Sequence, residues 1–149
     1  MAIFKLLHIL AVLVWVGGMF FAYMVLRPSA VEALQPPERL RLWDKVFSRF
    51  FNWVWLAVFV LLTSGFYMIY QLGGFALMPG YVHLMLLLGI VMMAIFAYVF
   101  FSCYVRFNLL VEAKEWPKAA EILATIRKLV GLNLVIGLLT VAEVIFGRG

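Results

Sequence analysis

Cysteine and charge are both scarce in this sequence. Its single cysteine, Cys103, excludes an intramolecular disulfide and a CxxC redox pair, and we interpret it as a packing residue. Of the 149 residues only 13% are charged, whereas 67% are hydrophobic, and the mean hydropathy is +1.10. These values exclude a soluble globular domain and indicate a multi-pass membrane protein.

The sequence instead contains long apolar runs. A helix that crosses a membrane rises about 1.5 Å per residue and needs roughly 20 apolar residues. Four segments meet this requirement: residues 3–26, 51–70, 81–104 and 129–147. We therefore predict an all-α fold, in which residues 1–149 form a single integral membrane domain, a four-helix bundle.

The connections have features of their own. Arg27-Pro28 is predicted to end the first helix, because proline disfavours helix in the residue before it. Residues 36–50 are predicted to form an amphipathic helix that runs into the second span, with Leu40, Trp43, Val46 and Phe47 on one face and the charged residues, Asp44 among them, elsewhere. Within that span, Thr63-Ser64-Gly65 is interpreted as a helix-packing segment.

The positive charges are concentrated in two of the loops. Ten of the twelve basic residues lie between spans one and two or between spans three and four, which fall on the same side of the membrane. By the positive-inside rule this side is cytoplasmic, so both termini lie on the outer, periplasmic side of a bacterial inner membrane. Topology accounts for the net charge of +5, and a nucleic-acid partner is not expected.

The two histidines, His8 and His83, lie near the outer ends of spans one and three, and Glu143 lies near the outer end of span four. At about 1.5 Å per residue, all three are about 5 to 8 Å from the outer interface. An imidazole in a span requires a partner, a cofactor or a substrate. The matched depth of the two histidines favours a shared site over two separate packing roles.

The helix face around His8 includes several small residues. They would allow another helix or a flat ligand to approach, and a hydrogen bond to a neighbouring helix is the simplest role for His8. The face consists of His8, Ala11, Val12, Trp15, Gly18, Met19 and Ala22.

Glu143 has several interpretations: it accepts a proton from a ligand histidine, holds a water at a haem propionate, relays protons, reaches the interface or pairs with Arg148.

Two imidazoles are suitable ligands for haem iron or for copper. Haem would need the two rings about 4 Å apart with the iron between them. Copper would benefit from soft ligands, but Met85 lies on a different helix face from His83, and the other methionines do not gather near the histidines. Both cofactors stay open at this point.

Two spans resemble a known family. LHILAVLVWVGGMFFAYMVLRP, in span one, is similar to the first span of the copper resistance protein D family, and span three resembles both that family and the HemJ-type membrane protoporphyrinogen oxidases. The resemblance implies that His8 and His83 are the metal or haem ligands, with Trp15, Gly17 and Gly18 as motif positions. The HemJ-type pattern has His-x-Lys, and Met85 stands in place of the lysine, which argues against oxidation of protoporphyrinogen.

Three hypotheses follow. The first is a b-type cytochrome with haem bound by His8 and His83, with Trp15, Gly18 and Glu143 around it, which transfers electrons near the periplasmic face to or from quinone or a periplasmic redox protein. The second is a copper-binding or copper-transport protein that uses the same histidines. The third is a structural or assembly subunit without a cofactor. Besides the lipid bilayer, a homodimer partner is compatible with each hypothesis, and enzymatic activity is left open.

Overall fold

The computed structural model describes residues 1–149 as four long helices joined by short connections. This all-helical architecture confirms the predicted fold class, and each long helix has the length and composition to cross a membrane. The elements in order are α1 (Ala2–Phe20), the π-helical segment η1 (Phe21–Leu26), α2 (Arg27–Ala33), α3 (Pro36–Gln71), the short 3-10 turn η2 (Phe75–Leu77), α4 (Gly80–Tyr98), the π-helical segment η3 (Val99–Tyr104), α5 (Val105–Glu112) and α6 (Trp116–Gly147).

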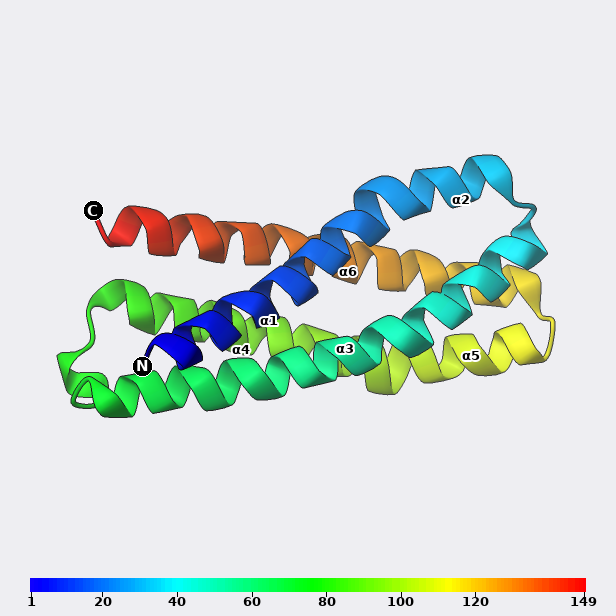
Figure 1. Ribbon diagram of the computed structural model, residues 1–149. Helices are drawn as coiled ribbons and strands as arrows, with labels where there is room; N and C mark the ends of the chain where they lie inside the picture. The colour runs from blue at the N-terminus through cyan, green and yellow to red at the C-terminus, as the bar shows by residue number, and fades with distance from the viewer.

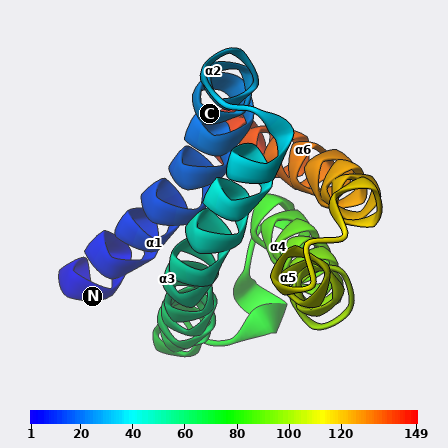
Figure 2. The same ribbon diagram turned by 90° about the vertical axis from the view of Figure 1, so that its right-hand side faces the viewer.

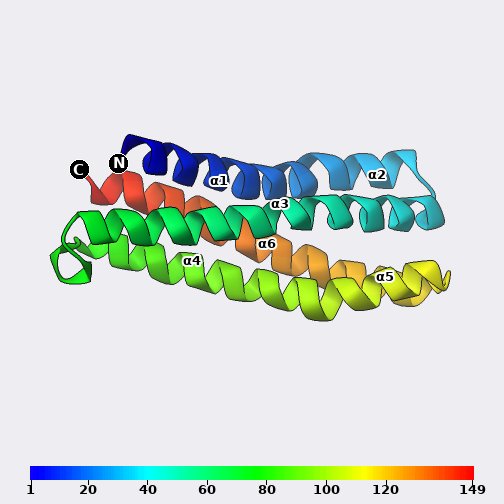
Figure 3. The same ribbon diagram turned by 60° about the horizontal axis from the view of Figure 1, so that its bottom comes forward.

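Successive long helices run antiparallel, which gives the bundle two different ends (Figures 1 and 3). The terminal end carries both chain termini and the connection 72–79. The basic end carries the short connections 34–35 and 113–115. Helix α1 packs mainly against α3, and α4 packs mainly against α6 (Figure 2).

The first long helix does not end at Arg27-Pro28 as predicted but continues to Ala33. The π-helical segment η1 explains this. The backbone N–H of Arg27 donates to the carbonyl of Ala22, five residues back, so this turn is wider than an α-helical turn and relieves the clash that a proline ring usually causes. Pro28 then lies in the first turn of α2, where its missing N–H has little cost.

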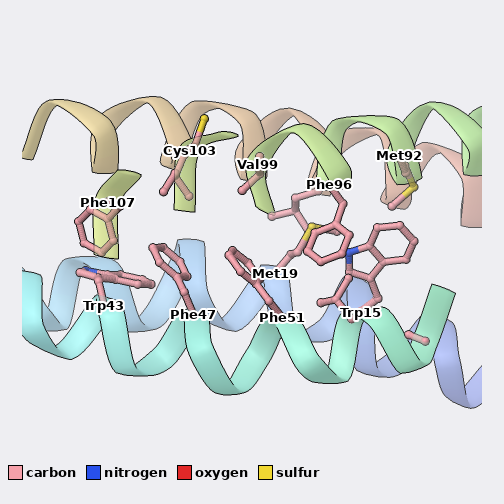
Figure 4. Packing of buried hydrophobic residues seen from close by; sticks show 14 of the residues in the cluster. Trp15, Met19, Trp43, Phe47, Phe51, Met92, Phe96, Val99, Cys103 and Phe107 are labelled. Carbon is pink, nitrogen blue, oxygen red and sulfur yellow. The ribbon is translucent and has the colours of Figure 1, made fainter. Parts of the chain in front are cut away.

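Aromatic rings form the core between α3 and the third long helix (Figure 4). Phe47 and Phe51 stack on α3 with centroids 5.0 Å apart, and Phe96 of α4 meets Phe51 edge-on at 5.4 Å. Trp15 of α1 packs on the same Phe96 at 6.2 Å. Cys103 is buried in this core, which confirms its interpretation as a packing residue.

Helix α3 confirms that residues 36–50 continue into the second span without a break. Leu40, Trp43 and Phe47 are buried on one face as predicted, but Asp44 is buried as well, contrary to its predicted place among the charged residues away from that face. The side-chain amide of Asn108 on α5 donates to both carboxylate oxygens of Asp44, at 2.9 and 3.1 Å. This partner explains how the helix can bury an acidic residue.

We predict that Asn108→Leu destabilises the protein by about 1–3 kcal/mol, because it leaves a buried carboxylate without its donor. The measurement is the unfolding midpoint in detergent followed by circular dichroism. Asn52→Leu is the matched control, since Asn52 lies exposed on α3 and makes no side-chain hydrogen bond. Equal loss of stability in the two variants would show that the Asp44 contact contributes nothing particular.

Helix α1 makes a tight contact with α3 at Gly18. A methyl group there would overlap the ring of Phe50, whereas a methyl group at the neighbouring Gly17 would meet nothing within 4 Å. The absence of a side chain at Gly18 therefore permits the contact between the two helices.

This asymmetry predicts that Gly18→Leu lowers stability and that Gly17→Leu does not. Overfilling a packed interface typically costs about 1–3 kcal/mol, while Gly17 faces outward. Both variants add the same side chain to the same helix, so each controls for the insertion of the other. Titration with a denaturing detergent measures the difference, and identical unfolding curves would contradict the proposed contact.

Candidate functional site

The two histidines and Glu143 lie toward the terminal end of the bundle. Gly137 on α6 lies close to Val16 on α1 and to Met92 on α4. A methyl group added at Gly137 would come within 3.0 Å of Val16 and 3.1 Å of Met92, so these three residues lie at one level of the bundle. Counted from these contacts at 1.5 Å per residue, His8, His83 and Glu143 lie about 9 to 14 Å farther along their helices toward the terminal end. The three side chains therefore lie at similar levels.

His8 is held against α3 by a hydrogen bond. Its Nδ1 lies 2.9 Å from the hydroxyl of Ser64. The Ser64 hydroxyl donates its own proton to the carbonyl of Val60, one turn back in α3. With that proton given to Val60, the Ser64 hydroxyl is an acceptor for His8, an arrangement that favours the tautomer with the proton on Nδ1 and a free lone pair on Nε2. No protein group hydrogen bonds to Nε2, which makes this nitrogen available to a ligand.

The surroundings of His8 keep its ring in place. Carbon Cε1 of the ring lies 3.5 Å from the position that a methyl group would occupy at Gly65, so α3 presents a flat surface there. One turn nearer the terminus, Phe4 of α1 stacks on Tyr67 of α3 with centroids 3.9 Å apart. The side chain of His8 is half-buried, with one edge against α3.

His83 has a different environment. It lies exposed in the first turn of α4, and its nearest aromatic neighbour is Phe75 in η2, with centroids 6.4 Å apart. Helix α3 lies between the first half of α1 and α4 (Figures 2 and 3), and no hydrogen bond or ring contact joins the two histidines. No group of three or more His, Cys, Asp or Glu side chains is placed to hold a metal ion. The shared site stays a prediction.

Glu143 is half-buried on α6, and its Oε2 is buried without a hydrogen-bond partner. It does not pair with Arg148, because the one salt bridge in the structure joins Lys118 to Glu115 at 3.4 Å. The ion-pair interpretation of Glu143 is therefore wrong. Its predicted roles beside a ligand histidine or in proton transfer are still predictions.

Trp15 and Gly18 lie deeper in the bundle than His8. Trp15 is two helical turns away, about 10 Å, and is buried in the aromatic core, while Gly18 contacts Phe50. The face of α1 predicted to receive a helix or a flat ligand thus receives α3. A role of these two residues in binding a cofactor stays a prediction.

Ser64 is the residue that sequence reasoning missed. Thr63-Ser64-Gly65 does pack against a helix, as predicted, but the partner that Ser64 meets is His8, 56 residues earlier. The signal was present: Ser64 lies in the half of span two nearer the terminal end, near the level of His8, and a histidine in a membrane needs a polar partner. The missing information was which helices are neighbours.

The sequence profile of the family described as copper resistance protein D matches residues 44–146, about two thirds of the chain. The chain belongs to this family. The matched residues include His83 and Glu143 and begin after His8. Comparison with curated proteins and with solved structures gives no match. The family and the four long apolar helices together show a multi-pass membrane protein related to copper resistance.

Ser64→Ala is predicted to remove the preference of His8 for the Nδ1–H tautomer, because the ring loses its only acceptor. Nitrogen-15 NMR of histidine-labelled protein measures this directly, and the chain has only two histidines. The signals of His83 are expected to stay unchanged. Thr63→Ala is the matched control, since the Thr63 hydroxyl bonds only to carbonyls of its own helix. An unchanged His8 tautomer in Ser64→Ala would contradict the assignment.

Proposed function

We propose that this protein binds copper as its cargo at the terminal end of the bundle, with Nε2 of His8 as the first ligand. The observation that carries the proposal is the hydrogen bond from His8 to Ser64, which fixes the ring and leaves Nε2 free. Metal-binding histidines commonly donate the N–H of their other ring nitrogen to a neighbouring acceptor in this way. Membership of the copper resistance protein D family supports copper as the metal.

Two further side chains support a cation at this end. His83 is exposed and offers a second imidazole, a ligand that suits copper. The unpartnered carboxylate oxygen of Glu143 lies at a similar level and would attract a positive ion. With the basic end in the cytoplasm by the positive-inside rule, the terminal end faces the periplasm across a bacterial inner membrane.

The haem hypothesis uses the same lone pair but requires more of the structure. Two axial histidines must face each other across one iron, whereas α3 lies between the first half of α1, which carries His8, and α4, which carries His83 (Figure 2). A copper ion can be held by His8 with fewer partners and without moving α1 past α3. Haem b, with quinone or a periplasmic redox protein as its partner, is kept as the alternative.

Copper binding is tested with purified protein in detergent by competition with a chromophoric Cu(I) chelator. His8→Ala is expected to weaken binding at least about tenfold, and His83→Ala to weaken it less, because His83 has no partner that orients it. Gln71→Ala is the control, since it removes a polar group from the terminal end and leaves both histidines in place. Equal copper affinity in all four proteins would overturn the proposal.

Absorption spectra of the same samples, oxidised and dithionite-reduced, before and after haem is offered, test the alternative. Bands of a low-spin b-type haem that disappear in both His8→Ala and His83→Ala would favour the cytochrome over the copper protein. Circular dichroism checks that each variant is folded, so that a lost signal reports on the ligand.

A further inference from the structure

The basic end of the bundle contains a pocket of about 200 Å³ between the η1–α2 segment, α3 and α6. Figure 1 shows these three segments together at that end. Eleven of the fifteen residues that line the pocket are hydrophobic. Its only charged residues are Arg27, Arg39 and Arg127, one from each of the three surrounding segments.

These arginines have no acidic partner. The only salt bridge in the structure lies elsewhere, between Lys118 and Glu115. The Nη2 of Arg39 donates to the carbonyl of Leu34 at 3.3 Å, while its Nε is buried without any partner. The guanidinium of Arg27 lies over the ring of Tyr23, 5.2 Å from its centroid. Three positive charges therefore line one apolar pocket, and no acidic side chain lies in its lining or forms a salt bridge with them.

The backbone explains why the pocket is there. Segment η1 contributes Ala22 and Tyr23 to its wall, and π-helical turns of this kind are often found at functional sites. The ring of Tyr23 packs against α6 at Gly131, where an added methyl group would come within 2.9 Å. This contact holds η1 close to α6 on one side of the pocket.

We propose that this pocket binds a phosphate group carried by an acidic amphiphile, with an anionic phospholipid headgroup as the source that fits best. A guanidinium presents paired N–H donors that match the oxygens of a phosphate. Basic pockets between membrane helices on the cytoplasmic side bind such headgroups. The apolar lining, which includes Trp43 and Phe47, provides a surface for the beginning of an acyl chain.

Native mass spectrometry of the protein in a neutral detergent tests the proposal, with phosphatidylglycerol and phosphatidylcholine as probes. The unmodified protein is expected to retain one phosphatidylglycerol under conditions that remove phosphatidylcholine. Arg39→Gln and Arg127→Gln are each expected to weaken phosphatidylglycerol binding about tenfold or more, because each loses a charged donor. Arg127→Lys, which keeps the charge but loses the paired donors, should lie between.

Arg49→Gln is the matched control: it removes the same charge from α3 at an exposed position outside the pocket, and it should bind like the unmodified protein. Circular dichroism and size-exclusion chromatography identify any variant that fails to fold. The remaining arginine variants then test whether the pocket binds phosphatidylglycerol. Inorganic phosphate is the second probe of the pocket. If it raises the melting temperature with the same arginine dependence and displaces phosphatidylglycerol, the source is free phosphate.

Retention of phosphatidylglycerol that is equal to that of phosphatidylcholine, together with no effect of phosphate, would overturn the site. Binding of either probe that Arg39→Gln and Arg127→Gln leave unchanged would overturn it as well. None of these measurements depends on copper, so the result is independent of the function proposed for the terminal end.

Discussion

Inside a lipid bilayer every polar group must find its partner within the protein, and the architecture of this chain follows from that constraint. Long unbroken helices satisfy the backbone, and the widened turn at η1 lets the first of them pass Pro28. Hydroxyl side chains bond to their own helices, as Thr140 does to the carbonyl of Ile136 at 2.7 Å. Ser64 satisfies two needs at once, because it donates to its own helix and accepts from His8. The imidazole can therefore lie in a helix interface, and its second nitrogen stays free.

The exceptions to this constraint are three buried polar atoms without a partner: Arg39 Nε, Asn133 Oδ1 and Glu143 Oε2. Unpaired buried polar atoms are rare and costly, and those that carry charge in a membrane protein commonly mark functional positions. Arg39 lines the pocket between η1–α2, α3 and α6 at the basic end, and Glu143 lies near the level of the histidines at the terminal end. The two charged exceptions thus fall where an anion and a cation, respectively, are proposed to bind.

Sequence reasoning predicted the features that depend on one helix at a time. Hydropathy gave the four long helices, and the spacing of Ala11, Trp15 and Met19 identified the buried face of α1. It did not predict which helices are neighbours, because counting residues fixes depth in a bundle and not lateral position. The pairs His8–Ser64 and Asp44–Asn108 were missed for this reason. The end of the first helix was wrongly predicted at Pro28. The rule that proline ends a helix assumes α-helical turns, whereas η1 is π-helical.

The interior between the two ends bears on what the protein can do with copper. Arg39 and Ser64 are 25 positions apart on α3, about 37 Å along the helix, and the interior between them is packed with aromatic rings. A cavity in this region measures only about 20 Å³, is lined almost entirely by hydrophobic side chains and has Asn133 as its one polar residue. Passage of a metal ion needs successive sites that each offer a ligand. The interior holds Cys103, Asn133 and the thioethers of Met19 and Met92, all buried among hydrophobic side chains, and Asn133 already uses its amide to donate to the carbonyl of Met92. The packing therefore favours a protein that binds copper at one face of the membrane over one that conducts it through the centre of a single bundle.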